Sequence, residues 1–148
     1  MHIIFKREED RGKGKTTALF NKVCQQCNRI MVVPNEVART YVVRNAKSLN
    51  PFMETKFIES KVVVAKKFIY SANIKDLEVY VDEGIDLVTM MKLIQLSERG
   101  TIHIKDVIIA DYTSNLHTTD ESNTHGFIHG AVIKGNIVKS SEGGSIWL

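Results

Sequence analysis

Two patterns of hydrophobic and polar positions alternate along roughly the first 110 residues. Short runs rich in β-branched and apolar residues predict strands, at 2–6, 29–33, 76–81 and 102–110. Apolar residues spaced three and four positions apart predict helices, at 15–27, 35–48 and 87–98. Strands that alternate with helices form a mostly parallel sheet with helices on both faces. We therefore expect an α/β fold with three layers, α/β/α.

Two stretches do not follow this simple alternation. Residues 55–70 are rich in β-branched and aromatic residues and predict one or two further strands. Residues 114–126 are polar and predict a long loop, and the apolar stretch 127–138 contains glycines and predicts a hairpin. We therefore expect a core over residues 1–115, on which a polar loop and C-terminal hairpin, residues 116–148, pack.

The composition is that of one globular domain. The chain has 148 residues, of which 43% are hydrophobic and 25% are charged. No apolar run approaches the roughly 18 residues of a membrane-spanning helix, and residues 1–5 are too few for a signal peptide. We expect a soluble, cytoplasmic protein that does not enter a membrane. The net charge of +3 permits contact with nucleic acid without requiring it.

The stretch EDRGKGKTT, residues 9–17, contains most of a phosphate-binding loop. Such a loop needs glycines that expose backbone N–H groups, a lysine for the outer phosphates and a hydroxyl for Mg²⁺. The residues predicted to bind the nucleotide are Gly12, Lys13, Gly14, Lys15, Thr16 and Thr17. Glu9 stands where the full pattern has its first glycine, and its carboxylate would repel phosphates. The simpler alternative is a lysine-rich, solvated turn.

A pair of acidic residues closes the strand with the sequence VYVDE. Phosphoryl transfer with Mg²⁺ needs a carboxylate near the metal and a group that orients the attacking water. Asp82 would hold the metal with Thr16, and Glu83 would orient the water. An Asp-Glu-Gly turn also ends many strands without any chemistry. The phosphate-loop pattern earlier in the chain favours the catalytic interpretation.

The polar residues that follow three predicted strands define a common site. Ligands of parallel sheets bind beyond the carboxyl ends of the strands. The segments 7–14, 82–84 and 111–115 follow three such ends, so we expect them to meet. Thr113 or Asn115 would then contact the terminal phosphate, although an ordinary loop is an equal alternative.

The only two cysteines, Cys24 and Cys27, have the spacing of redox and zinc sites. Structural zinc usually has four protein ligands, and the possible further ligands, His125 and His129, lie far along the chain. We therefore expect two thiols near the end of a helix, without a metal.

Three motifs together resemble those of a known family, namely RGKGKTTAL, VYVDEG and DVIIADYT. They are similar to the P-loop NTPases with a catalytic glutamate, and most of all to terminase-type packaging ATPases and helicase-like proteins of phages and viruses. The resemblance covers about residues 1–115. It implies a P-loop NTPase fold, ATP and Mg²⁺ as cofactors, and DNA, a homo-oligomer or a larger viral assembly as partner, in the cytoplasm of the host.

The resemblance also implies roles for individual residues. Lys15 is matched to the loop lysine, Thr16 and Asp82 to the metal ligands, and Glu83 to the catalytic glutamate. Thr113 would join Lys15 and Glu83 as a catalytic residue. No arginine finger is evident beyond Arg99, which follows the last predicted helix.

Three functions remain open at this point. The first is Mg²⁺-dependent hydrolysis of ATP beside DNA, as in packaging or helicase-like proteins. The second is a non-catalytic nucleotide-binding or assembly module with a degenerate loop, which Glu9 favours. The third is a kinase of small molecules, but such enzymes need an arginine-rich lid and residues 114–126 contain no arginine or lysine. Four lysines are candidates for a DNA contact or a solvated edge, namely Lys56, Lys61, Lys66 and Lys67.

Overall fold

The computed structural model describes residues 1–7, 14–71, 74–111 and 145–147. The helices are α1 (Lys15–Cys24), α2 (Glu36–Leu49), α3 (Thr55–Lys61), α4 (Ala65–Phe68) and α5 (Leu87–Glu98). The strands are β1 (His2–Arg7), β2 (Arg29–Val33), β3 (Val62–Val64), β4 (Leu77–Val81), β5 (Ile102–Asp111) and β6 (Ser145–Trp147). The strands predicted at 2–6, 29–33, 76–81 and 102–110 and the helices predicted at 15–27, 35–48 and 87–98 are confirmed, each to within a few residues.

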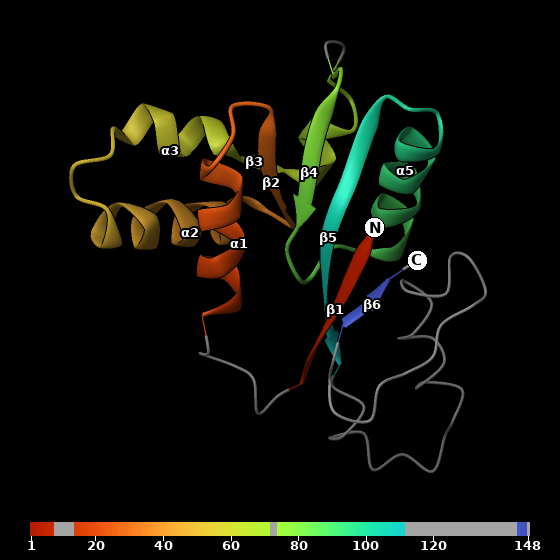
Figure 1. The fold of residues 1–148 in the computed structure, drawn as a ribbon, viewed down its shortest axis with the longest axis horizontal. Helices are drawn as coiled ribbons and strands as arrows, with labels where there is room; N and C mark the ends of the chain where they lie inside the picture. The colour runs from red at the N-terminus through yellow and green to blue at the C-terminus, as the bar shows by residue number, and fades with distance from the viewer. Residues whose placement is uncertain (8–13, 72–73, 112–144, 148) are drawn as a thin grey trace.

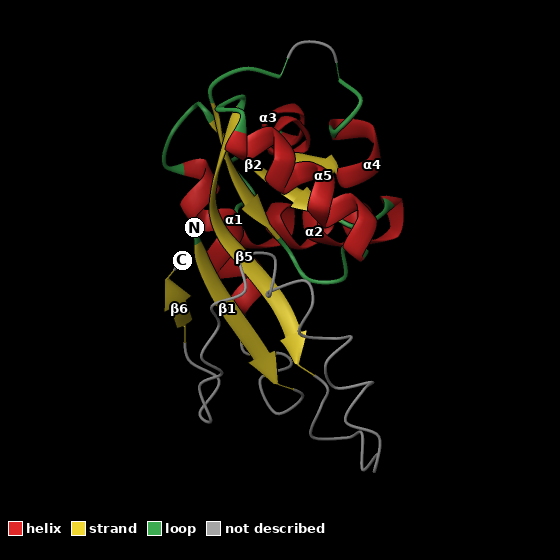
Figure 2. Ribbon diagram, turned by 90° about the vertical axis from the view of Figure 1, so that its right-hand side faces the viewer, coloured by secondary structure: helices red, strands yellow, loops and turns green. Residues whose placement is uncertain are grey.

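One sheet organises the described residues (Figure 1). Its strand order is β3-β2-β4-β5-β1-β6. The first five strands in this order are parallel to their neighbours, whereas β6 is antiparallel to β1. Figure 2 shows β5 beside β1, so β5 separates β1 from β4. The carboxyl ends of β1, β5 and β4 therefore follow one another along one edge of the sheet.

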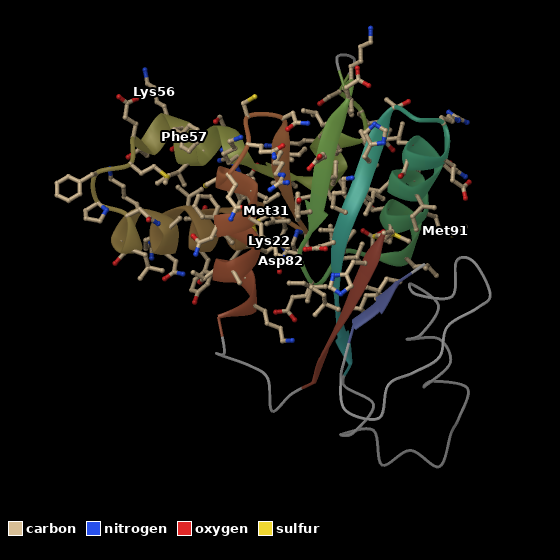
Figure 3. All side chains as sticks on the ribbon, viewed as in Figure 1. Lys22, Met31, Lys56, Phe57, Asp82 and Met91 are labelled. Carbon is tan, nitrogen blue, oxygen red and sulfur yellow. The ribbon has the colours of Figure 1, made fainter. Side chains whose placement is uncertain are left out.

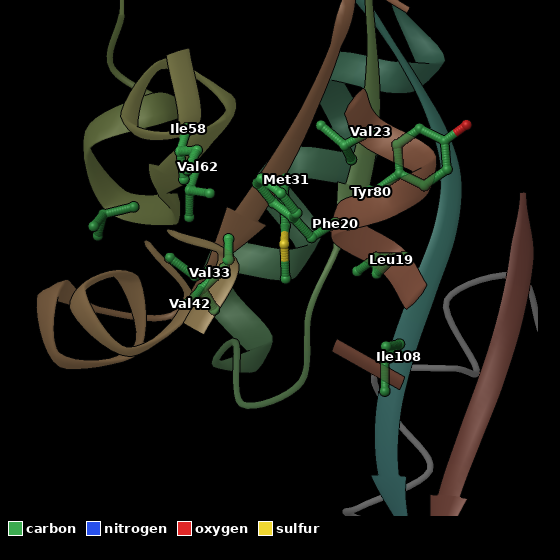
Figure 4. Packing of buried hydrophobic residues seen from close by; sticks show 12 residues of the cluster. Leu19, Phe20, Val23, Met31, Val33, Val42, Ile58, Val62, Tyr80 and Ile108 are labelled. Atoms are coloured by element: carbon green, nitrogen blue, oxygen red, sulfur yellow. The ribbon is translucent and has the colours of Figure 1, made fainter. Parts of the chain in front are cut away.

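Helices cover both faces of this sheet, so the predicted α/β class is confirmed and the arrangement is compatible with three layers, α/β/α. On one face, α1, α2 and α3 pack on the strands through a cluster that includes Phe20, Met31 and Ile58 (Figure 4). On the other face, α4 and α5 pack through a cluster that includes Val32 and Leu93. Each fully buried side chain of this size contributes about 1.5–3 kcal/mol to the free energy of unfolding.

Of the one or two strands predicted within residues 55–70, the structure confirms one, β3 (Val62–Val64). Only β3 is extended there, and the residues on both sides of it form α3 and α4. In α3, Ile58 is fully buried against α2 and the sheet, as is Val62 just beyond the helix. The burial of Ile58 on the inner face of α3 outweighs the strand preference of β-branched side chains, which depends on context.

A β-bulge in β5 changes which residues face each layer. Val79 pairs with Ile104, but the next residue, Tyr80, pairs with Asp106, so Lys105 is the extra residue. Ile104 faces the α5 side, whereas two residues after the bulge Ile108 faces the α1 side. The bulge therefore turns Asp106 toward α1, a direction that alternation alone would not predict.

The edge strand β3 is partly covered by a side chain from α2. The Nε atom of Arg39 donates to the carbonyl of Val62 at 2.8 Å, and its Nη2 atom donates to the carbonyl of Glu59 at 3.0 Å. A charged side chain on an exposed edge hinders further strands from pairing there. The predicted hairpin of residues 127–138 lies outside the described residues.

Candidate functional site

The first turn of α1 lies at the carboxyl edge of the sheet and begins at a glycine. Gly14 caps the helix with φ 75°, and its carbonyl accepts from the N–H of Ala18 at 2.8 Å. A Cβ atom at Gly14 would have open space around it, so glycine is favoured there by its backbone conformation alone. The first turn contains no acidic residue. Its N–H groups and the helix dipole favour an anion at this end.

Thr16 and Asp82 meet at this edge, as predicted, although they are 66 residues apart in the chain. The hydroxyl of Thr16 donates to Oδ1 of Asp82 over 3.3 Å. Asp82 lies between α1 and the sheet and is only 6% exposed (Figure 3). Its backbone N–H donates to the carbonyl of Val32 at 2.9 Å, which aligns the end of β4 with β2.

The residues after Asp82 form a turn against the end of β2. Glu83 is partly exposed, but its Oε2 atom is buried. Gly84 has φ 90°, and a Cβ atom there would lie 3.4 Å from Cγ of Pro34. The turn is therefore held both by the backbone conformation of Gly84 and by its contact with Pro34, and it places Glu83 beside the predicted metal ligand.

The strand order also places the end of β5 between these two groups. Asp111, the last residue of β5, pairs with Arg7 at the end of β1. The chain therefore leaves β5 between β1, which precedes the predicted phosphate loop, and β4, which precedes the acidic pair Asp82 and Glu83. A contact with a terminal phosphate is predicted for this segment. Several predicted residues lie outside the described ones, namely Glu9, Gly12, Lys13, Thr113 and Asn115.

A cleft beside α1 was not predicted from the sequence. It is small, with a volume of about 10 Å³, and lies between the first turns of α1 and the second half of α2. Here Nδ2 of Asn45 donates to the hydroxyl of Thr17 at 3.3 Å. Thr17 belongs to the predicted nucleotide-binding residues, so α2 is linked directly to the candidate site. Asn45 sits in an ordinary helical pattern, which carries no signal for this contact.

A second group of charged residues lies at the other end of α1. Asp106 is 5% exposed and accepts from Nζ of Lys22 at 2.8 Å. Its other carboxylate oxygen lies 3.1 Å from Nδ1 of His2. A partly buried ion pair of this kind joins α1, β1 and β5. The sequence could not reveal it, because Asp106 faces α1 only as a result of the bulge.

The arrangement of the basic residues differs from a continuous DNA-binding patch. Lys61 is 4% exposed and donates to three backbone carbonyls, those of Gln26, Cys27 and Arg29, so it is used within the fold. Lys67 forms an ion pair with Glu36. Lys56 and Lys66 are exposed, on different helices. The four lysines therefore do not act together as one surface.

The candidate arginine finger, Arg99, is positioned away from the site. Arg99 ends α5 and precedes β5, so it lies at the amino edge of the sheet, opposite the start of α1. It therefore does not supply an arginine finger to a nucleotide bound in the same protomer.

Both cysteines are free thiols; Cys24 is the last residue of α1 and Cys27 lies in the turn beyond it. Burial raises the pKa of the Cys24 thiol, and the nearby ammonium of Lys61 offsets this only in part. A raised pKa means less thiolate at neutral pH and a weaker nucleophile or metal ligand. Among the residues that the structure describes, no group of three or more His, Cys, Asp or Glu side chains is placed to hold a metal. His125 and His129 lie outside them.

Comparison with known proteins identifies no relative of this chain. No protein-family model matches the chain, and no curated protein or solved structure matches it either. Within the described part of the chain, every helix is too short or too polar to cross a bilayer.

Proposed function

We propose that this chain binds a nucleoside triphosphate, with ATP as the expected nucleotide, together with Mg²⁺ and hydrolyses it. The observation that carries the proposal is the hydrogen bond from Thr16 to Asp82. It joins the hydroxyl of the phosphate-loop pattern to the carboxylate at the end of an inner strand. The resemblance to phage and viral ATPases further suggests that hydrolysis is coupled to DNA handling.

The residues at the edge fit a hard cation. Mg²⁺ prefers oxygen ligands and commonly keeps one or two from the protein while phosphates and waters supply the others. The hydroxyl of Thr16 and the carboxylate of Asp82 are such ligands, and they lie 3.3 Å apart. When bound, the metal would neutralise charge on the outer phosphates.

The chain's own groups then have distinct tasks. The N–H groups at the start of α1 and the ammonium of Lys15 would bind the phosphates. Glu83, directly after Asp82, would accept a hydrogen bond from a water and orient it for in-line attack on the terminal phosphorus. Thr113 would contact the terminal phosphate from the segment that follows β5.

The alternative is a module that binds the nucleotide without hydrolysing it. One observation favours it: Glu9 replaces the first glycine of the loop pattern. Such a module would serve in assembly, through nucleotide-dependent contacts with a second copy or a viral partner.

Nucleotide binding is tested by titrating a fluorescent ATP analogue in the presence of Mg²⁺. Lys15→Ala is expected to weaken binding by about tenfold or more, because the loop lysine is the main side-chain contact to the outer phosphates. Lys66→Ala is the matched control, since Lys66 is an exposed lysine of α4. Equal affinities for the wild type and Lys15→Ala would refute the phosphate site.

Phosphate release then separates the two alternatives. Glu83→Gln is expected to bind ATP like the wild type but to hydrolyse it about 100-fold more slowly, because the amide is a poor base for the water. If the wild type binds ATP and releases no phosphate, the non-catalytic module is correct. A normal rate in Glu83→Gln would show that Glu83 does not orient the water.

A further inference from the structure

The helices α2 and α3 form a hairpin that projects from the β3 side of the sheet. Figure 1 shows the loop that joins them at the left end of the molecule, far from β1 and β5. Phe52, in this loop, is 100% exposed, and Tyr41 on α2 is 66% exposed. Phe57, near the start of α3, is 40% exposed. Large exposed apolar side chains that gather on one element mark an interaction surface.

The loop that presents Phe52 is held in place by several hydrogen bonds. Lys47 donates to the carbonyls of Pro51 and Met53, the first of them at 3.1 Å. Asn50 donates to the carbonyl of Ala46 from its backbone N–H at 2.9 Å and from its side chain at 3.0 Å. The aromatic ring is therefore displayed on an ordered loop, and a partner would lose little entropy by binding it.

The charges around this loop indicate the chemistry of the partner. Residues 44–56 contain three basic residues, Arg44, Lys47 and Lys56, and a single acidic residue, Glu54. Arg44 and Lys56 are exposed, and Figure 3 shows Lys56 on the outer side of α3. Aromatic rings among basic side chains suit single-stranded nucleic acid, whose bases stack on the rings while its phosphates meet the cations.

The hairpin is also adjacent to the candidate nucleotide site. Asn45 lies on α2, and it donates to the hydroxyl of Thr17 in the first turn of α1. The cleft between α1 and α2 extends from Thr16 to Asn50, at the base of the loop that carries Phe52. The same helix thus contacts the predicted phosphate site and supports the exposed aromatic residue.

We infer that the α2–α3 hairpin is a contact surface for single-stranded nucleic acid. Phe52 stacks on an unpaired base, and Arg44 and Lys56 face the phosphate backbone. A duplex is a poorer fit, because its bases are already stacked on one another. This inference rests on the proposed function for its choice of nucleic acid as partner.

The test is fluorescence anisotropy with a labelled single-stranded oligothymidylate, measured without nucleotide. Phe52→Ala is expected to weaken binding about tenfold, since one base–aromatic contact has a large share in such complexes. Tyr70→Ala is the matched control, because Tyr70 is an aromatic residue 73% exposed that lies outside the hairpin. Wild-type affinity should fall as salt is added, and Arg44→Ala should lower that salt dependence.

Three outcomes would overturn the inference. The first is an equal affinity for Phe52→Ala and the wild type, and the second is no binding by the wild type even at low salt. The third is that Phe52→Ala dissociates a homo-oligomer in sedimentation velocity while oligonucleotide binding is unchanged, which would make the hairpin a contact between copies. ATP binding by the wild type and by Lys15→Ala is measured separately. If ATP binds and the oligonucleotide does not, the inference about the hairpin is wrong while the proposed nucleotide site stands.

Discussion

Each end of helix α1 faces a buried aspartate, and the two are used differently. Asp82 faces the first turn, where it accepts a hydrogen bond from the neutral hydroxyl of Thr16 at 3.3 Å. Asp106 faces the last turn, where the ammonium of Lys22 lies at 2.8 Å and the ring of His2 at 3.1 Å. Both aspartates are about equally buried, at 6% and 5% exposure.

This difference between Asp82 and Asp106 shows that burial of a carboxylate does not by itself identify a functional residue. A carboxylate removed from water loses hydration, and basic partners or hydrogen bonds must offset that cost. At Asp106, the side chains of Lys22 on α1 and His2 on β1 offset this cost, and their contacts link α1, β1 and β5. At Asp82, the hydroxyl and carboxylate oxygens converge at the edge where ligands of parallel sheets bind, which is the arrangement that suits a hard cation.

The largest effect on stability is expected from Asp106→Ala. Removal of one partner of a fully buried ion pair costs about 3–5 kcal/mol. We expect the low end, about 3 kcal/mol, because Lys22 is half exposed and regains water. Urea unfolding would measure this loss. At Asp82, loss of the hydrogen bond from Thr16 accounts for about 1 kcal/mol of the cost expected for Asp82→Ala. The comparison fails if Asp82→Ala is the more destabilised variant.

The reverse order is expected for binding of the nucleotide. Asp82→Asn keeps the shape of the side chain but removes a charge from the predicted metal site, so Mg²⁺-dependent affinity should fall about tenfold or more. Asp106→Asn, measured under conditions in which the variant is folded, should bind the nucleotide with the affinity of the wild type. Repeating both titrations with a chelator in place of Mg²⁺ should abolish the difference between the variants. A difference that persists with the chelator would exclude a metal role for Asp82.

Two glycines offer a matched test of the start of α1. Gly14 and Gly100 have φ of 75° and 76°, and a Cβ atom at either would meet open space. Alanine at each position should cost about 1 kcal/mol of unfolding free energy through backbone strain alone. Only Gly14→Ala is expected to weaken nucleotide binding as well. Equal binding by the two variants would argue against a phosphate site at α1.

The smallest effect concerns a third aspartate, at the start of α5. Asp86 accepts from the hydroxyl of Thr89 at 2.7 Å and from its N–H at 3.1 Å. Asp86→Ala should lower the free energy of unfolding by about 1 kcal/mol near neutral pH, which is the usual contribution of a helix N-cap. The hydrogen bond from the Thr89 hydroxyl is the main cause that lowers the pKa of Asp86, with the N–H of Thr89 adding to it.

The pH dependence of the stability of Asp86→Ala tests whether the ionised carboxylate of Asp86 stabilises the fold. A lowered pKa means that the ionised carboxylate stabilises the fold fully above its unfolded pKa and loses this contribution as the pH falls through the folded pKa. The difference in unfolding free energy between the wild type and Asp86→Ala should therefore be constant near neutral pH and shrink as the pH falls below about 4. A difference that grows in acid would show that the carboxylate does not stabilise this helix start.

Local patterns were sufficient for most elements but not for residues 55–70. Strands β1, β2, β4 and β5 and helices α1, α2 and α5 carry their own periodicity, so their positions are evident in the sequence. The helix α3 lies in a stretch, 55–70, whose overall composition predicts strands, and it packs as a helix with Ile58 buried against α2 and the sheet. Lys61 likewise looked like an exposed cation, yet it is buried and bonded to the turn before β2.

The sequence by itself determined the alternation of strands and helices, the glycine at the start of α1, and the polar residues at the strand ends. Each of these is a local property of spacing and residue type. Only the tertiary structure decided which residues meet: Thr16 with Asp82, Asn45 with Thr17, and Asp106 with Lys22. These contacts depend on the strand order, on the bulge in β5 and on the packing of α2. Such features arise from residues far apart in the chain, so no local pattern encodes them.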